Sequence, residues 1–240
     1  MAATGKRGSD VAHPKQKRTK NEDCSQPTLQ DFEKRAIACQ MNIQFFSKSK
    51  CATERYLSNF TFFGMGIPFS SGGELLSFPT IEHAFQTAKY STSMSTGDRT
   101  SAAFEQLMQT LQNPRTQAAD AKTLGGRRSM AAVGFTLVAD EWNARSEDIM
   151  RQLVRARAGV DDLYAKILRT AALRMIRFYH FERTGSKSVW GGCVPKSMPL
   201  LLGLPDYSQW QGGNLLGKIL SEVGQELLLK EERSKPPPAE

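Results

Sequence analysis

Residues 78–90 read FPTIEHAFQTAKY, and this stretch decides how the middle of the chain folds. Pro79 and Thr80 are typical of a helix start, because proline needs no N–H partner there and a threonine hydroxyl can cap the first turn. We therefore predict a helix that begins directly after them. Glu82 and Lys89 are seven residues apart in it, close to two full turns, so both side chains project from one face.

The face that carries Glu82 and Lys89 also carries an apolar stripe. On spacing alone, a solvated helix with two unrelated charges is the simpler interpretation. The stripe overlaps the charged face, however, which indicates that both charges are partly buried. A buried charge needs a partner or a function. We therefore take Glu82 and Lys89 as candidate catalytic residues; the stripe consists of Ile81, Ala84, Phe85 and Ala88.

Helical periodicity continues beyond this stretch. Apolar residues recur every three or four positions in residues 104–111, 164–175 and 216–227, which predicts three more amphipathic helices. Residues 42–46 and 56–63 are rich in aromatic and aliphatic side chains with partial alternation, which favours short strands. The sequence therefore predicts a mainly α fold with a few short strands, and an α+β fold is the alternative.

The composition limits the domain organisation. The chain has 240 residues, of which 40% are hydrophobic, and its mean hydropathy is −0.43. This suits one sizeable core, and no apolar run approaches the roughly 20 residues that a membrane-spanning helix needs. We predict a disordered basic tail over residues 1–41, one catalytic domain over residues 42–229 and a disordered tail over residues 230–240. The first residues lack a secretory signal, so we expect an intracellular protein. We also expect a monomer that contacts no membrane.

The net charge of +8 is concentrated near the beginning of the chain, since residues 1–50 hold ten Lys and Arg against five Asp and Glu. Lys15, Lys17, Arg18 and Lys20 form a cluster of the kind that importins or nucleic acid recognise. We therefore expect a nuclear protein; a solvated tail on a cytoplasmic protein is the alternative.

Four cysteines lie far apart without a CxxC pair, so the sequence predicts no zinc site, no disulfide framework and no cofactor.

Residues 26–32 have the spacing of the peptide that docks on the sliding clamp of DNA replication. Gln26 is followed by the aliphatic Leu29 at three positions and by the aromatic Phe32 at six. In such a peptide, one helical turn inserts the two apolar side chains into a pocket of the partner. The eighth position normally carries a second aromatic residue and is Glu33 here, which weakens the motif. The clamp is therefore a candidate partner.

Four motifs in order resemble the NADAR family. Their order and spacing are kept from about residue 43 to residue 225, and the tail before residue 42 lies outside the resemblance. The resemblance implies a YbiA-like helical domain that hydrolyses an N-glycosidic bond. The motifs are Tyr56-Leu-Ser58-Asn59-Phe60, the stretch of residues 78–90, Glu182 with Trp190-Gly191 eight residues later, and Trp210-Gln-Gly-Gly-Asn214-Leu-Leu-Gly217-Lys.

Members of this family act on ADP-ribose attached to the exocyclic amine of guanine in nucleic acid, or on ribosylated intermediates of riboflavin synthesis. Both substrates present a ribose C1 atom bonded to nitrogen, and cleavage builds positive charge on C1 that a carboxylate stabilises. Glu82 suits this role. Lys89 either attacks C1 as a neutral amine, which leads to a Schiff base, or stays charged and pairs with Glu82. The sequence leaves both roles open.

The basic tail favours removal of ADP-ribose from guanine in DNA or RNA, because an enzyme of small metabolites needs no such tail. One alternative is an N-glycosidase that acts on ribosylaminopyrimidine intermediates of riboflavin synthesis. Another is a non-catalytic module that binds ADP-ribose or NAD, against which the presence of both Glu82 and Lys89 argues.

The other motif residues are expected to bind substrate. Ser58 and Asn59 offer a hydroxyl and an amide to ribose, and the Trp190-Gly191 pair offers an aromatic face and close backbone approach to a base. Asn214 precedes a predicted helix, where a phosphate finds the positive end of the helix dipole. His83 is assigned to the same set, most simply as a structural partner at its helix start.

Two further positions carry charge. Arg127 or Arg128 suits bidentate binding of a pyrophosphate, and either also suits a surface position. Family members often carry Asp three residues before the Trp-Gly pair, where this chain has Lys187. A second acid therefore falls to Glu182, which we include among the substrate-binding residues, or to Asp206.

Overall fold

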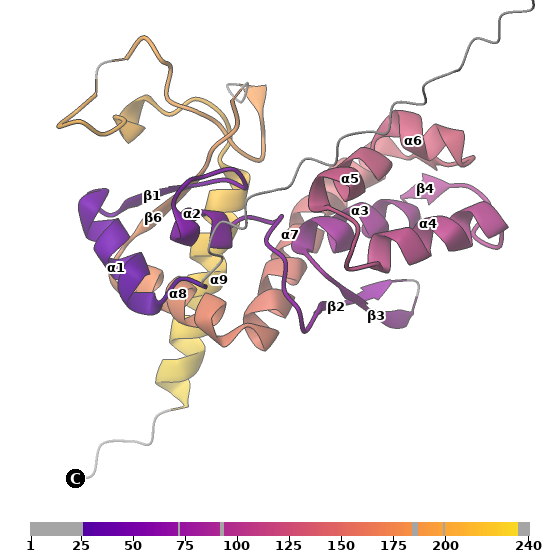
Figure 1. Cartoon of the computed structure of the whole chain (residues 1–240), viewed down its shortest axis with the longest axis horizontal. Helices are drawn as coiled ribbons and strands as arrows, with labels where there is room; N and C mark the ends of the chain where they lie inside the picture. Colours follow the sequence, from indigo (N-terminus) through magenta and orange to yellow (C-terminus); the bar gives the residue numbers. More distant parts are fainter. Residues whose placement is uncertain (1–25, 72, 92–93, 184–186, 199, 235–240) are drawn as a thin grey trace, which may run out of the picture.

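The computed structural model describes residues 26–71, 73–91, 94–183, 187–198 and 200–234, and this part of the chain is mainly α-helical (Figure 1). The predicted fold class is therefore confirmed. The helices are α1 (Leu29–Ala38), α2 (Ala52–Tyr56), α3 (Ile81–Ser91), α4 (Ala102–Gln112), α5 (Ala118–Leu124), α6 (Arg127–Ala132), α7 (Ala139–Val160), α8 (Asp162–Leu173) and α9 (Leu215–Arg233), with a 3-10 turn η2 (Tyr207–Gln209). The strands are β1 (Asn42–Phe45), β2 (Ile67–Ser71), β3 (Glu74–Phe78), β4 (Ser95–Thr96), β5 (Thr136–Leu137) and β6 (Arg177–His180).

One half of the molecule groups α1, α2, α8 and α9 around the parallel pair of β1 and β6 (Figure 1). Ile43 of β1 lies opposite Phe178 of β6, and both side chains are buried. Helix α9 packs against α8 and β6. Gly217 and Gly224 permit this close approach, because a Cβ atom there would lie 2.3 Å from the carbonyl oxygen of Phe178 and 2.5 Å from that of Leu168.

The other half contains α3 to α6 with the short antiparallel pairs β2–β3 and β4–β5. Helix α7 runs between the halves and contacts α3 as well as α9. The larger hydrophobic core joins α1, α3, α7, α8, α9 and the strands β1, β2 and β6. A smaller one fills the space among α3 to α6 and consists of Tyr90, Leu107, Leu111, Ala121, Met130 and Phe135.

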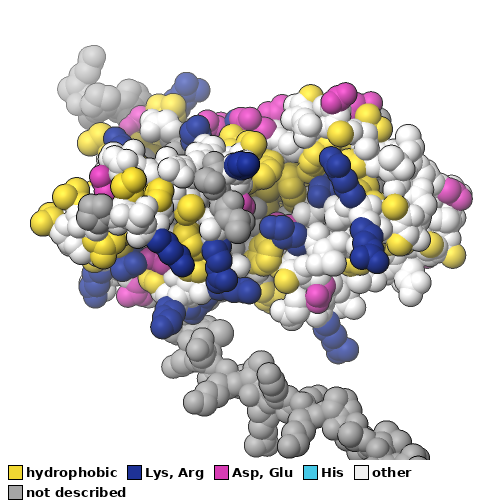
Figure 2. All heavy atoms as spheres, turned by 90° about the horizontal axis from the view of Figure 1, so that it is seen from above, with side chains coloured by type: hydrophobic (Ala, Val, Ile, Leu, Met, Phe, Trp, Pro, Cys, Tyr) yellow, Lys and Arg dark blue, Asp and Glu magenta, His cyan; other side chains and the backbone are white. Residues whose placement is uncertain are grey.

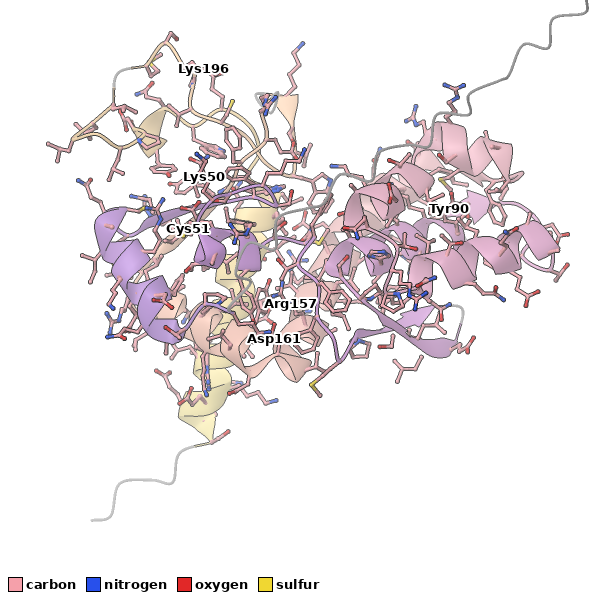
Figure 3. The ribbon with its side chains drawn as sticks, viewed as in Figure 1. Lys50, Cys51, Tyr90, Arg157, Asp161 and Lys196 are labelled. Carbon is pink, nitrogen blue, oxygen red and sulfur yellow. The ribbon has the colours of Figure 1, made fainter. Side chains whose placement is uncertain are left out.

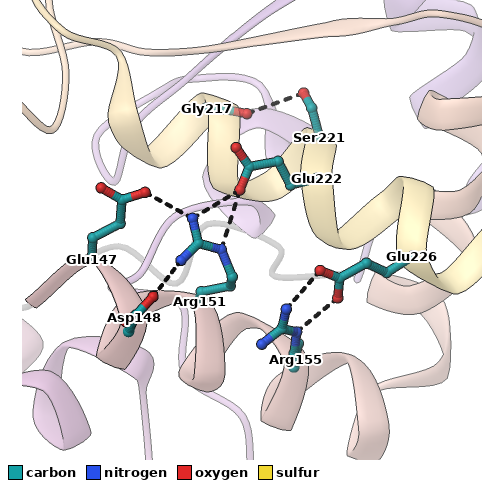
Figure 4. A network of polar contacts seen from close by, with 8 residues as sticks. All are labelled: Glu147, Asp148, Arg151, Arg155, Gly217, Ser221, Glu222 and Glu226. Carbon is teal, nitrogen blue, oxygen red and sulfur yellow. Dashed lines mark hydrogen bonds and ion pairs between the residues drawn. The ribbon is translucent and has the colours of Figure 1, made fainter. Parts of the chain in front are cut away.

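Ion pairs on the surface join α7 to α9 (Figure 4). Arg151 bridges Glu147 and Asp148 of its own helix to Glu222 of α9, and Arg155 makes a two-fold contact with Glu226. Such exposed pairs contribute about 0–1 kcal/mol each. The buried apolar residues that α7 and α9 contribute to the larger core therefore hold the two helices together more than these pairs do.

Arg157 lies fully buried near the junction of α7 and α8 (Figure 3). Its Nε atom is 3.2 Å from the carboxylate of Asp161, and its guanidinium stacks between the rings of Tyr56 and Tyr164, at 4.8 and 4.0 Å from the centroids. It also donates to the carbonyl oxygens of Tyr56, at 3.0 Å, and Ser58, at 3.4 Å. Arg157 thus fixes the backbone after α2.

Residues 29–38 are helical, so the prediction of a disordered tail that extends to residue 41 is wrong. Thr28 and Asp31 form a capping box at the start of α1, and Phe32 and Ala36 are buried. The described domain therefore begins near Thr28, and α9 extends it to Arg233 instead of residue 229. The basic cluster of residues 15–20 and the last residues, 235–240, lie outside the described residues.

The structure also contradicts the use of Gln26, Leu29 and Phe32 as a clamp-binding peptide. Phe32 is 0% exposed and packs against Phe178 with ring centroids 6.3 Å apart, and Leu29 packs against the same core. Phe32 is therefore not available to a partner while the domain is folded, and Leu29 is partly buried. The pattern that resembles the docking peptide is the inner face of α1.

Some local predictions also differ from the structure. The predicted strand over residues 56–63 is irregular after Tyr56, because Arg157 and turn hydrogen bonds use its backbone carbonyls. Met175 was predicted to lie on a buried helix face, but it follows the end of α8 with φ of 56° and is exposed. The hairpin of β2 and β3 and the long α7 were not predicted.

No described helix has the length and apolar character to cross a membrane.

Candidate active site

A pocket of about 540 Å³ opens where the ends of β1 and β6 face α3, α5 and α7. On the face seen in Figure 2, hydrophobic side chains line a hollow, and Lys and Arg side chains gather around it. A pocket of this size suits a nucleotide-sized ligand. Its lining residues are Phe46, Ser47, Lys48, Ser58, Asn59, Phe60, Glu82, Phe85, Gln86, Lys89, Lys122, Trp142, Met150, His180, Phe181, Glu182, Arg183, Trp190 and Leu216.

Glu82 lies in the first turn of α3 and is only 5% exposed. Its backbone N–H donates to the carbonyl of Asn59 at 3.1 Å, and its carboxylate accepts a hydrogen bond of 2.7 Å from the amide of Gln86. Burial raises the pKa of Glu82 above its ordinary value, although Gln86 and the positive charges of Lys122 and Lys89 oppose this. Glu82 is therefore a buried acid whose charged form is only partly stabilised by its neighbours.

Lys89 lies two turns further along α3 and faces the same pocket. Its Nζ atom donates to the carbonyl of Gly125 at 3.0 Å and lies 5.3 Å from the ring centroid of Trp142. Burial lowers the pKa of Lys89, and the negative charge of Glu82 partly opposes this. Among the described residues, no ion pair within 4.0 Å joins the carboxylate of Glu82 to a cation. The two side chains therefore share a pocket without a tight ion pair.

Gly125, at the end of α5, brings its loop against α3. A Cβ atom on this residue would lie 1.8 Å from the side-chain oxygen of Gln86, so only glycine fits against that side chain. The close approach places the carbonyl of Gly125 within reach of Lys89 and that of Leu124 within reach of the Tyr90 hydroxyl, which donates to it at 2.5 Å. The loop thus fixes the amine at one end of the pocket.

Comparison with known families identifies the domain that contains this pocket. A family model described as the NADAR domain matches residues 45–228, which is more than half of the chain. The chain belongs to the NADAR family. Membership is consistent with an N-glycosidase-type role, and the matched segment contains every residue that lines the pocket.

Other comparisons concern the fold and the curated sequences. The NADAR domain is similar in structure to the E. coli protein YbiA, known from NMR, with a TM-score of 0.52 and 18% sequence identity over 82% of this chain and 91% of YbiA. A comparison with curated proteins gave no significant sequence match. The YbiA likeness shows a shared fold.

Six of the residues predicted from the sequence line the pocket of about 540 Å³. Besides Glu82 and Lys89, these are Ser58, Asn59, Glu182 and Trp190. The ring of Trp190 meets that of Phe85 edge to face, with centroids 5.4 Å apart, and Phe85 in turn meets Trp142 at 4.9 Å. Of the two candidates for a second acid, Glu182 lines the pocket, whereas Asp206 caps η2 outside it.

Three other predicted residues do not line the pocket, and their contacts instead support the fold around it. His83 is fully buried, with its ring nitrogens 2.8 Å from the hydroxyl of Thr80 and 3.1 Å from the carbonyl of Thr116, and burial lowers its pKa. Asn214 makes no side-chain cap, because its side chain instead accepts from the N–H of His180 and donates to the carbonyl of Phe178, both at 2.9 Å. Gly191 packs against His180 and Glu182, which line the pocket.

Gly191 packs closely against the end of β6, next to two residues that line the pocket. A Cβ atom there would lie 2.6 Å from the carbonyl of His180 and 2.8 Å from Cγ of Glu182.

Arg127 and Arg128 are exposed on α6 and are not among the residues that line the pocket. Neither the phosphate role of Asn214 nor the pyrophosphate role of these arginines is therefore supported.

The structure adds three cations and a histidine that are not among the residues predicted from the sequence. Lys48, Lys122 and Arg183 line the pocket, each from a different segment, and the amine of Lys122 lies 5.8 Å from the ring centroid of Phe60. His180 stacks on Phe45, and burial lowers its pKa. Of these four residues, only Lys122 has a signal in the sequence, because it lies two residues before Leu124-Gly-Gly. Among the described residues, no group of three or more His, Cys, Asp and Glu side chains is arranged to hold a metal ion.

Proposed function

We propose that this protein hydrolyses the N-glycosidic bond between ADP-ribose and the exocyclic amine of guanine in nucleic acid. The observation that carries the proposal is a buried acid in a pocket that also holds cations. Glu82 is 5% exposed, while Lys48, Lys122 and Arg183 line the same pocket from other segments. A pyrophosphate needs such cations, and a positive charge that develops on ribose C1 needs such a carboxylate.

The aromatic residues of the pocket suit the bases of this substrate. Trp190 and Phe60 lie on its wall, and Phe46 packs against Phe181 beside it, with ring centroids 5.1 Å apart. Planar bases stack on such rings. Ser58 and Asn59, on the wall next to Glu82, offer polar atoms to ribose hydroxyls. The pocket therefore matches each part of ADP-ribose with a suitable group.

We assign Lys89 the role of nucleophile. Burial lowers its pKa and so raises the share of neutral amine, and its hydrogen bond to Gly125 leaves it separate from Glu82. The Nζ–C1 bond forms as the bond from C1 to the guanine nitrogen breaks, while the charged Glu82 stabilises the positive charge on C1 and solvent takes the proton that Lys89 loses. We assign the proton transfer to the departing nitrogen to Glu182, the second acid among the residues that line the pocket. Opening of the ribose ring gives a Schiff base, which water hydrolyses to ADP-ribose and free lysine.

A substrate comparison tests the proposal. The protein is incubated with an oligonucleotide that carries ADP-ribosylated guanine and, separately, with ribosylaminopyrimidine phosphates, and released products are measured by mass spectrometry. We expect ADP-ribose from the oligonucleotide and none in the Glu82→Gln variant, whereas Glu105→Gln, which changes an exposed glutamate of α4, keeps activity. Cleavage of the pyrimidine alone would make the protein a metabolite N-glycosidase. Binding of ADP-ribose without cleavage of either would make it a binding module.

A further inference from the structure

A second groove of about 490 Å³ adjoins the candidate active site. Ser47 and Phe60 belong to the walls of both cavities, so the groove lies next to the pocket that holds Glu82. Its lining residues are Gln26, Pro27, Ser47, Ala52, Arg55, Tyr56, Phe60, Thr61 and Phe62. A ligand that fills the active site and extends past Phe60 would enter this groove.

Phe62 is 56% exposed although it belongs to an ordered segment. Hydrogen bonds fix this segment on both sides, from the Thr61 hydroxyl to the carbonyl of Arg55 at 2.6 Å and from the N–H of Phe63 to the carbonyl of Pro79 at 2.9 Å. The fold therefore holds an aromatic ring at the surface. Phe60, closer to the active site, offers a second ring in the same groove.

The charge around the groove is positive. Arg55 lines it, held by hydrogen bonds to the carbonyls of Ser49 at 2.7 Å and Lys50 at 2.9 Å, and no acidic side chain is among its described lining residues. Lys48 and Lys50 are exposed on the adjoining loop (Lys50 is labelled in Figure 3). Cations beside accessible aromatic rings are the features that bind single-stranded nucleic acid, because phosphates meet the cations and bases stack on the rings.

We propose that this groove binds the nucleotides next to the modified guanine in a single strand, with a neighbouring base on Phe62 and its phosphates near Arg55 and Lys50. This inference rests on the proposed function and narrows its substrate class to a strand instead of a free nucleotide or nucleoside. A small metabolite would fill the pocket around Glu82 and leave the groove unused.

A binding measurement tests the groove without any catalysis. An unmodified, fluorescently labelled single strand of about eight nucleotides is titrated with the full chain, because sites of this kind cover several nucleotides. We expect Phe62→Ala to weaken binding roughly tenfold, the loss of one stacked base. Met65→Ala is the matched control, since Met65 is 81% exposed in the same segment but does not line the groove. Equal affinity of the Phe62→Ala variant and the wild type would overturn the proposal.

A second experiment compares two substrates of the reaction. The ratio of kcat/KM for a strand with ADP-ribosylated guanine to kcat/KM for ADP-ribosylated guanosine should fall about tenfold in Phe62→Ala and keep its wild-type value in Met65→Ala. Equal loss on both substrates would show that Phe62 acts through the fold and would overturn the groove. Strand binding that depends on Phe62 in a protein that releases no ADP-ribose would support the groove and contradict the proposed function.

The basic segment of residues 1–25 is the competing site for the strand. Alanine at Lys15, Lys17, Arg18 and Lys20 in the full chain removes its main cluster of charge. We expect Phe62→Ala to weaken binding by the same factor in this background. If the four substitutions abolish binding and Phe62→Ala alone has no effect, the strand binds to that segment and the groove proposal is overturned.

Discussion

The side-chain amide of Gln86 donates a hydrogen bond of 2.7 Å to the carboxylate of Glu82, one turn earlier in α3. The same pair of residue types occurs in α4, where Gln109 donates to Glu105 at 3.4 Å. Glu82 is buried, whereas Glu105 is exposed. The chain therefore contains a matched surface control for the central contact of the pocket.

Replacing Gln86 by methionine should shift the pH dependence of activity. The hydrogen bond from Gln86 favours the charged form of Glu82, so its loss raises the pKa of Glu82 further. A hydrogen bond to a charged group contributes about 1.5–3 kcal/mol, which corresponds to roughly one pH unit or more. The acid limb of the kcat/KM profile should move to higher pH in Gln86→Met and stay in place in Gln109→Met. A shift of the basic limb alone would mean that Glu82 acts in its protonated form.

The Glu82→Gln variant should be more stable than the wild type at neutral pH. Burial raises the pKa of Glu82 in the folded state above its unfolded value, so the folded protein holds the proton more tightly. Between the two values the free energy of unfolding falls as pH rises, and above both the full cost of the buried charge is present. Thermal melts should show a higher Tm for the variant at pH 7 and no difference below about pH 4. A lower Tm for Glu82→Gln at pH 7 would contradict the direction of the pKa shift.

Lys89 should form a covalent adduct with the sugar during turnover. Borohydride reduces a Schiff base to a stable amine, so mass spectrometry of the trapped protein should locate one sugar adduct at Lys89. Because only the neutral amine attacks, trapping should increase with pH through the lowered pKa of Lys89. Lys89→Met should abolish trapping, whereas Lys166→Met, which changes an exposed lysine of α8, should not. Full turnover without an adduct would assign Lys89 an electrostatic role instead.

Much of the fold, and the central residues of the site, followed from the sequence for physical reasons. Glu82 and Lys89 are in one helix, so their common face depends only on helix geometry. Lys122 and His180 come from separate elements, and nothing in their local sequence indicates that α5 and β6 converge on α3. Phe32 was misassigned because the inner face of an amphipathic helix and a docking peptide show the same spacing. Asn214 has the position of a helix cap, but β6 offers its side chain two better partners.

Breaking the buried pair of Arg157 and Asp161 should destabilise the protein strongly. Asp161→Asn leaves the fully buried guanidinium without its counter-charge, which costs about 3–5 kcal/mol. Arg155→Met, which breaks the exposed pair with Glu226, should cost less than about 1 kcal/mol. The free energy of unfolding from urea denaturation checks both values. Similar small losses would show that Arg157 does not hold the segment after α2 in place.

The most direct test of the central claim is the rate at which the Glu82→Gln variant releases ADP-ribose from ADP-ribosylated guanine in a single-stranded oligonucleotide. The substitution keeps the size of the side chain, removes its charge and exchanges one acceptor oxygen for an NH2 donor. Under single-turnover conditions we expect the rate to fall about 10²- to 10⁴-fold, with a circular dichroism spectrum like that of the wild type and with Glu105→Gln unaffected. Release by Glu82→Gln at a rate within a few-fold of the wild type would contradict the assignment of this pocket as the site of glycosidic bond cleavage.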